Sequence, residues 1–238
     1  MANQFYDPGD QRAQKVSDLF ASIAPRYDLI NDLQSFGLHR YWKQRVVRLA
    51  RPQPGERALD LCCGTGDLAL GLAGRGALVS GVDFSEPMLQ VAARRSFKAS
   101  PSFVRADAQR IPFRDHSFHI VTVGYGLRNL ANWETGLREM HRVAMAGGRL
   151  LVLDFGKPDN ALWRTLYFGY LRMFVPLLGK LFCGNAAAYS YILESLKQYP
   201  AQRGVASKMH ELGLVKVRVV NLLGGVMSIN YGEKPSHG

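Results

Sequence analysis

Residues 58–67 have the sequence Ala58-Leu59-Asp60-Leu61-Cys62-Cys63-Gly64-Thr65-Gly66-Asp67, an apolar strand that leads into a glycine-rich turn. The apolar residues 68–72 follow directly and predict the start of a helix. The two glycines let the backbone turn sharply and approach a ligand, and the N-terminus of the following helix offers free amide donors. We therefore expect the first strand–loop–helix unit of an α/β fold with a nucleotide-type cofactor loop.

Three acids that follow strand-like segments narrow the choice of cofactor. The loop alone also satisfies the loose dinucleotide pattern, but Asp60 would repel a pyrophosphate. A carboxylate at that place can accept hydrogen bonds, directly or through water, from a cationic amino group. Asp83 ends the segment 78–83 and can accept from both hydroxyls of a ribose. Asp107 ends the segment 102–106 and can meet an adenine amino group, so the pattern indicates a cationic adenosine cofactor.

Periodic apolar segments predict the rest of the architecture. With 238 residues, 47% of them hydrophobic, and no linker-like tract, the chain suits one domain with a full core. We expect a doubly wound, mostly parallel, seven-stranded sheet with N-terminal helices and a helical cap insert. The expected parts are N-terminal helices 1–55, a cofactor-binding core 56–155, a cap insert 156–200, and a C-terminal helix and hairpin 201–238. The further expected strands are 118–123, 149–153 after a Gly147-Gly148 turn, 215–220 and 226–231.

These motifs resemble known families at two levels. Residues 55–155 resemble the class I methyltransferases that use S-adenosylmethionine, a Rossmann-like fold, although the family usually has a proline where this chain has Ala146. The segments 27–32, 35–43, 124–129 and 189–195 resemble the demethylmenaquinone and ubiquinone-pathway C-methyltransferases. This second resemblance extends over nearly the whole chain.

The resemblance implies a cofactor, a reaction and a set of site residues. The cofactor would be S-adenosylmethionine, and the reaction would convert a demethylated prenyl naphthoquinol into the menaquinone-type product. Open alternatives are the benzoquinol of the ubiquinone pathway, another lipophilic acceptor, a non-catalytic scaffold that binds cofactor or quinone, and, less favoured, a dinucleotide oxidoreductase. The expected cofactor-binding residues are Asp60, Gly64, Thr65, Gly66, Asp83, Asp107, Ala108 and Gly124.

For catalysis the resemblance points to Arg128 and Asn129. A hydroquinone carbon becomes strongly nucleophilic beside an ionised phenolic oxygen, so the protein must stabilise or remove a phenolic proton. Because arginine stays protonated, we expect Arg128 to hold a water or stabilise the phenolate and Asn129 to orient the group. Tyr27 and His39 could flank the acceptor ring, or serve a structural and a capping role instead. The C-terminal hairpin of the family commonly carries a His-Arg pair, where this chain has Asn230-Tyr231.

The charge and one apolar segment bear on the partners. The net charge is +11, and residues 40–51 carry five basic side chains and no acid, which suits either a solvated helix face or attraction to anionic lipid. No RNA-binding signature accompanies the charge, so we expect no nucleic acid. Residues 162–182 are apolar and aromatic, but three basic residues and Pro176 exclude a transmembrane helix, and Pro176 should break or kink any helix. The segment is either a structural cap or a lid for a greasy acceptor at the bilayer; a homodimer stays open.

Cysteines and histidines add two negative expectations. Three cysteines cannot supply a disulfide framework, and the beginning of the chain lacks the parts of a signal peptide, which favours a reduced cytoplasmic protein. The basic residues 40–51 and the apolar residues 162–182 add the expectation of a peripheral place at the inner face of the cell membrane. The adjacent Cys62 and Cys63 are better explained as packing and loop residues than as a redox pair. His116 and His119 flank the start of a strand without a third ligand beside them, so we expect no metal.

Overall fold

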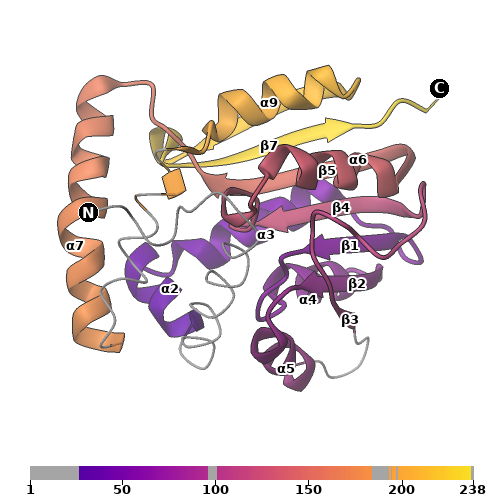
Figure 1. Cartoon of the computed structure of the whole chain (residues 1–238), viewed down its shortest axis with the longest axis horizontal. Coiled ribbons are helices and arrows are strands. Elements are labelled where there is room, and N and C mark those ends of the chain that lie inside the picture. Colours follow the sequence, from indigo (N-terminus) through magenta and orange to yellow (C-terminus); the bar gives the residue numbers. More distant parts are fainter. Residues whose placement is uncertain (1–26, 96–100, 184–192, 194, 197, 237–238) are drawn as a thin grey trace.

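The computed structural model describes residues 27–95, 101–183, 193, 195–196 and 198–236. In this part of the chain seven strands form one sheet in the order β3-β2-β1-β4-β5-β7-β6 (Figure 1). The strands are β1 (Arg57–Leu61), β2 (Leu78–Asp83), β3 (Ser102–Arg105), β4 (Phe118–Gly124), β5 (Ala144–Phe155), β6 (Val215–Leu222) and β7 (Met227–Glu233). The helices are α2 (Tyr27–Ser35), α3 (Leu38–Ala50), α4 (Asp67–Ala73), α5 (Glu86–Arg94), α6 (Trp133–Val143), α7 (Ala161–Cys183) and α9 (Ala201–Glu211), with short 3₁₀ turns η2 (Leu127–Asn129) and η3 (Leu223–Gly225).

The sheet is doubly wound and mostly parallel, as the sequence predicts. Strands β3, β2, β1, β4 and β5 are parallel, while β7 pairs antiparallel with β5 and β6 pairs antiparallel with β7. The chain winds outward from β1 through β2 to β3 and then returns to β4 on the other side of β1. The carboxyl ends of β1 and β4 therefore flank a topological switch point, which is where open α/β sheets bind ligands.

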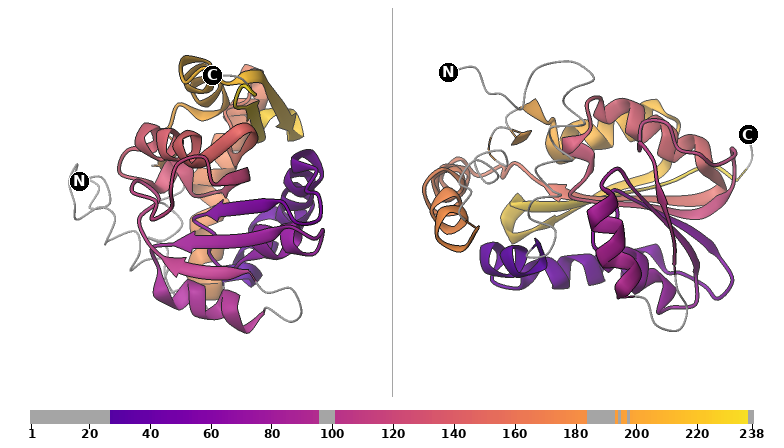
Figure 2. Two further views of the ribbon diagram at one scale, coloured as in Figure 1. Left: turned by 90° about the vertical axis from the view of Figure 1, so that its right-hand side faces the viewer. Right: turned by 60° about the horizontal axis from the view of Figure 1, so that its bottom comes forward.

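Helices cover both faces of the sheet, and each face has its own apolar core (Figures 1 and 2). On one face α6 and α9 bury side chains such as Leu137 and Met209 against the odd-numbered side of β1 and its neighbours. On the other face Trp42 and Val46 of α3 and Leu72 of α4 pack on the alternate residues of the same strands. Strands buried on both faces explain why these segments are apolar runs rather than alternating patterns.

The ends of the sheet confirm one expected feature and modify another. The C-terminal hairpin forms where it is predicted, and the turn that joins its strands contains Gly224, with a positive φ of 63°. Gly147 and Gly148 belong to β5 rather than to a separate turn, because the pairing of β4 with β5 shifts between Ala144 and Arg149. The residues expected as a turn therefore lie in an irregular stretch of the strand, where Gly147 has a φ of 74°. Residues 1–26 of the expected N-terminal helices and most of the segment 189–195 lie outside the described residues, and the division into domains stays a prediction.

Helix α7 differs from expectation at Pro176. It runs from Ala161 to Cys183 without interruption, so the predicted break is wrong, while the kink stays a prediction. A proline inside a helix has either effect, and a long helix can continue past it on its remaining hydrogen bonds. Figure 1 shows α7 standing across the ends of the parallel strands, next to α2, and Tyr170 Oη donates to the Gln34 carbonyl at 2.9 Å. In the described part of the chain, no helix combines the length and apolar character needed to cross a membrane.

Strand β5 gives a direct test of this two-faced packing. Leu151 is fully buried, whereas Leu78 at the start of β2 is 63% exposed. We expect Leu151→Ala to lower the free energy of unfolding by about 2–5 kcal/mol, since it leaves a cavity, and Leu78→Ala to lower it by less than about 1 kcal/mol. Equilibrium denaturation with urea measures both. Similar losses in the two variants would contradict the assigned core.

Candidate active site

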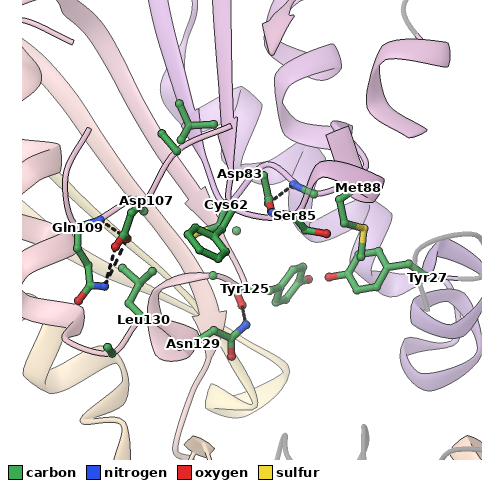
Figure 3. Close-up of a pocket in the computed structure, with 18 residues that line it drawn as sticks. Tyr27, Cys62, Asp83, Ser85, Met88, Asp107, Gln109, Tyr125, Asn129 and Leu130 are labelled. Carbon is green, nitrogen blue, oxygen red and sulfur yellow. Dashed lines mark hydrogen bonds between the residues drawn. The ribbon is translucent and has the colours of Figure 1, made fainter. Parts of the chain in front are cut away.

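A cavity opens at the carboxyl ends of β1, β2 and β4 and beside the loop after β3 (Figure 3). A smaller cavity continues it under the glycine loop, toward Asp60. The two share a wall of five residues: Tyr27, Cys62, Gly64, Gly124 and Tyr125. The site therefore lies at the switch point that the sheet topology indicates, and it has two connected compartments.

The loop between β1 and α4 has the backbone that its glycines predict. Gly64 and Gly66 have φ values of 53° and 87°, a region that side chains disfavour. A Cβ at Gly66 would also lie 3.1 Å from the Cβ of Ala92 and 3.3 Å from the ring of Phe103. Thr65 lies between the two glycines, and its hydroxyl donates to Asp28 Oδ1 at 2.9 Å. Any enlargement of Gly66 would push the loop away from the sheet.

Asp83 at the end of β2 joins this loop to the next one. Its Oδ2 accepts a hydrogen bond from the Gly64 amide at 2.8 Å, and its Oδ1 accepts from the Ser85 amide at 2.9 Å. Each carboxylate oxygen keeps a further lone pair for a ligand hydroxyl. Burial raises the pKa of the Asp83 carboxyl, and the amide donors oppose that effect. The geometry suits a carboxylate that is held rigidly while it binds a ribose.

Asp60 is a buried acid at the end of the smaller cavity. Its side chain accepts from the Thr122 hydroxyl at 2.7 Å and from the Ala69 amide at 3.1 Å. Burial raises the pKa of this carboxyl to about 7, although Thr122, Ala69 and the charge of Lys43 oppose the shift. A cation beside Asp60 would favour its ionised form, because it restores the charge compensation that burial removes.

The residues expected at the adenine end line the larger cavity. Asp107 accepts a hydrogen bond from the Gln109 amide at 2.8 Å, and Ala108 lies between them. Gly124 borders both cavities, and a Cβ there would lie 2.8 Å from Leu68 Cδ1, so a larger residue would require the Leu68 side chain to move. All eight residues expected to bind the cofactor belong to the walls of these cavities or, for Gly66, to the loop that shapes them.

An ion-pair network connects the N-terminal helices to the glycine loop. Arg95, just after α5, donates to Asp28 Oδ2 at 3.0 Å, to the Thr65 carbonyl at 3.0 Å and to Asp67 Oδ1 at 2.7 Å. Lys43 of α3 donates to the other oxygen of Asp67 at 2.6 Å. Sequence reasoning missed these contacts, since the partners are up to 67 residues apart and no local pattern joins them.

Arg128 and Asn129 lie in the turn after β4, where the resemblance predicts them. Arg128 is buried; its guanidinium donates to the Tyr125 carbonyl at 2.6 Å, lies 3.5 Å from Asp154 and packs 4.9 Å from the centre of the Phe155 ring. Asn129 donates to the same Tyr125 carbonyl at 3.0 Å and faces the larger cavity. The two side chains therefore hold the backbone of Tyr125, which has a positive φ of 62°.

The two residues expected beside the acceptor ring are placed differently. Tyr27 lines both cavities and points toward Tyr125 in Figure 3. His39 is only 3% exposed, and its Nε2 lies 2.8 Å from Asp32 Oδ1. It is not among the residues that line either cavity. The structure thus gives His39 a contact between α2 and α3, and its role at the acceptor stays a prediction.

Several cavity residues have no role that the sequence predicts, although Tyr125 belongs to the segment 124–129. Ser85 and Tyr125 have buried hydroxyls that no described residue hydrogen-bonds. Burial raises the pKa of Tyr125 well above its ordinary value, so this hydroxyl is a neutral donor. Met88 and Leu130 add apolar surface to the larger cavity (Figure 3). Among the described residues, no cluster of three or more His, Cys, Asp or Glu side chains could hold a metal ion.

These features define a class of protein. Solved structures with the same arrangement are S-adenosylmethionine-dependent methyltransferases: one from Thermotoga maritima has a TM-score of 0.66 with 18% identity, covering 91% of this chain and 99% of its own. The magnesium protoporphyrin IX methyltransferase of Synechocystis, solved with S-adenosylhomocysteine, has a TM-score of 0.58 with 19% identity, covering 82% and 83%. The fold is that of a class I methyltransferase.

The sequence profile of the ubiE/COQ5 methyltransferase family matches residues 9–234, and the chain belongs to that family. The ubiquinone/menaquinone biosynthesis C-methyltransferase UbiE of Azotobacter vinelandii is 41% identical, with 96% of this chain and 93% of the relative covered. The demethylmenaquinone methyltransferase of Desulfitobacterium hafniense is also 41% identical, with 95% and 92% covered. The protein is a C-methyltransferase of quinone biosynthesis that uses S-adenosylmethionine, and the dinucleotide alternative is excluded.

The cavity residues fit this cofactor. Asp83 offers acceptors to a ribose, Asp107 offers them to an adenine amino group, and the buried acid Asp60 suits an ammonium far better than a phosphate. The hydroxyls of Ser85 and Tyr125, which no described residue hydrogen-bonds, add donors and acceptors at the same cavity. When bound, S-adenosylmethionine supplies an electrophilic methyl group, and the protein's own tasks are alignment and exclusion of water.

Asp83 gives the first prediction for the site. Asp83→Ala removes the expected ribose contacts together with the brace on Gly64, so we expect cofactor affinity to fall by at least tenfold, about 1.5–3 kcal/mol. Calorimetric titration with S-adenosylhomocysteine measures this. Glu86→Ala removes the same charge from the exposed first turn of α5 and serves as the control. Unchanged affinity in a folded Asp83→Ala protein would refute the assignment.

Asp60 gives a prediction about pH. With a pKa of about 7 in the cofactor-free protein, the carboxyl is mostly protonated at pH 6 and mostly ionised at pH 8. A ligand ammonium binds the ionised form, so binding below pH 7 should release a proton from Asp60, and this release should fade above pH 8. Titrations in two buffers of different ionisation enthalpy count the protons. Asp60→Asn should abolish this part of the release; an identical proton count in the variant would contradict the pKa.

Proposed function

We propose that the chain methylates a demethylated prenyl naphthoquinol at carbon, converting demethylmenaquinol to menaquinol. The observation that carries this choice is that menaquinone is common to the names of the relatives, which mention either ubiquinone and menaquinone together or demethylmenaquinone alone. A naphthoquinol is therefore the acceptor that both groups of relatives share. The benzoquinol of the ubiquinone pathway is the alternative that the first group supports.

The wall that the two cavities share supports an aromatic, lipophilic acceptor beside the cofactor. Its side chains include Tyr27 and Tyr125, between the compartment of Asp83 and Asp107 and the compartment of Asp60. Binding sites for such ligands are largely apolar, with a few polar groups that fix orientation. Tyr27 and Tyr125 offer an apolar face with a hydroxyl at its edge, which suits a hydroquinone ring.

Arg128 and Asn129 are the residues that we propose to act on the acceptor. A cation near a phenolic oxygen favours the phenolate, and the phenolate makes the neighbouring carbon nucleophilic. Arg128 does not line either cavity; its guanidinium lies 3.5 Å from Asp154 and brings a positive charge close to Asn129 and Tyr125, which line the larger cavity. Asn129 faces the cavity directly and is suited to orient the phenolic group. Their shared hold on the Tyr125 carbonyl also keeps the Tyr125 hydroxyl in place.

We further propose that the protein meets its substrate at an anionic membrane. On α7 the side chains of Leu166, Met173 and Phe174 are 57%, 69% and 56% exposed, and this helix lies beside the ends of the strands where the site opens. Arg164 and Arg172 are exposed on the same helix. Exposed apolar side chains flanked by basic ones suit a lipid surface. The cavity lining contains no described residue of α7, so the support is for a surface contact rather than for a lid.

The acceptor is tested by assaying both quinols with labelled S-adenosylmethionine. We expect the naphthoquinol to be methylated with the higher kcat/KM, and Arg128→Ala to lower turnover by about 10²-fold or more while S-adenosylhomocysteine binds within about threefold of wild type. Arg138→Ala removes an exposed arginine from α6 and is the control. A preference for the benzoquinol would replace the proposed substrate. Normal turnover of Arg128→Ala at saturation would remove Arg128 from the reaction.

Membrane contact is tested by flotation with lipid vesicles. Wild type should bind vesicles with anionic lipid more than neutral ones, and less at high salt, because screening shortens electrostatic reach to about 8 Å near physiological ionic strength. Replacing Leu166, Met173 and Phe174 by serine should abolish flotation without loss of thermal stability. The same change at Leu78 is the control for an exposed leucine elsewhere. Equal binding to both lipids, or an unaffected triple variant, would refute the proposed surface.

A further inference from the structure

The smaller cavity is lined by charged side chains, and of these only Asp60 has so far been assigned a contact with the cofactor. Its lining contains two acids, Asp60 and Asp67, and one cation, Lys43. Asp60 is expected to meet the ammonium of the cofactor's methionine end. An α-amino acid also carries a carboxylate close to its ammonium, and that carboxylate must lie in the same compartment. Without a cation there, it would face two acids across a small cavity.

Lys43 is held in a fixed position at this compartment. Its side chain is 11% exposed, and its Nζ donates to Asp67 Oδ2 at 2.6 Å. Asp67 is fixed in turn by Arg95, whose Nη2 donates to Asp67 Oδ1 at 2.7 Å. The Lys43 ammonium also lies 5.8 Å from the centre of the Tyr125 ring, which borders both cavities. The Lys43 side chain would therefore lose little conformational freedom on binding an anion.

The ammonium of Lys43 has more hydrogen-bond donors than its bond to Asp67 requires. It carries three N–H donors, and the hydrogen bond to Asp67 uses one of them. Asp67 shares its charge between Lys43 and Arg95, so neither cation is fully neutralised by it. An ammonium with free donors at one side of a small cavity and a carboxylate at another match the two charges of an amino acid.

We propose that Lys43 binds the carboxylate of the cofactor's methionine end, opposite the ammonium site at Asp60. Helix α3 is thereby part of the cofactor site, in addition to covering the sheet. Lys43 is 11% exposed beside the cavity, whereas Arg48 on the same helix is exposed to solvent. The chemical class recognised is an α-amino acid joined to a nucleoside.

The test compares two ligands that differ only in the carboxylate. S-adenosylhomocysteine carries it, and S-adenosyl-3-thiopropylamine has the same nucleoside, sulfur and amino group without it. Calorimetry of the full chain should show wild type binding the first more tightly by about tenfold or more. Lys43→Met should lose that preference, weakening S-adenosylhomocysteine by the same factor and the decarboxylated ligand by less than about threefold. Arg48→Met removes a positive charge from the same helix and should keep the preference.

A structural role of the Lys43–Asp67 pair predicts a different result. If Lys43 only positions the loop, Lys43→Met weakens both ligands in parallel, and the proposal is overturned. It is also overturned if neither ligand responds. Lys43→Arg keeps the charge and should retain a measurable preference for the carboxylate, and Lys43→Gln tests the proposal in the same way should the methionine variant fail to fold. Thermal unfolding of each variant confirms that the folded proteins are compared.

Discussion

The site depends on one carboxylate, that of Asp83, which joins two loops that different strands deliver. It accepts from the Gly64 amide in the loop after β1 and from the Ser85 amide in the loop after β2. Gly64 has a positive φ, which glycine adopts without strain, so the loop needs a contact that selects this conformation. The hydrogen bond from its amide to Asp83 is such a contact. Because both strands are parallel, the sheet brings the two loops to the same edge, where the carboxylate joins them.

Ion pairs attach the N-terminal helices α2 and α3 to the start of α4, beside the glycine loop. Arg95 joins Asp28 of α2 to Asp67 at the start of α4, and Lys43 of α3 joins the same Asp67. Partly buried ion pairs of this kind contribute less to stability than to geometry, because desolvation offsets much of the Coulomb attraction. Here they position Tyr27, the first residue of α2, at the wall that the two cavities share.

The sheet and the places of the expected cofactor residues around the two cavities follow from the sequence because their signals are local. A strand, a tight glycine turn and a terminal acid lie within ten residues, and parallel strands bring successive acids to one edge. Contacts such as Lys43 with Asp67 or Tyr170 with Gln34 leave no such pattern, since they depend on how α2, α3 and α7 pack. Pro176 is the reverse case: the local sequence predicts a break, but the helix from Ala161 to Cys183 continues through this position.

The turn after β4 shows why a residue's position does not settle its role. Arg128 has two effects that a single substitution removes together: its charge near Asn129 and Tyr125, and its hydrogen bond to the Tyr125 carbonyl. A hydrogen bond from a charged group is ordinarily worth about 1.5–3 kcal/mol, so losing the hold on Tyr125 could by itself account for one to two orders of magnitude in rate. Asn129 donates to the same carbonyl without carrying charge. The excess loss at Arg128 over that at Asn129 therefore contains the effect of its charge on the acceptor, the greater strength of its charged hydrogen bond to the Tyr125 carbonyl and the loss of its contact with Asp154.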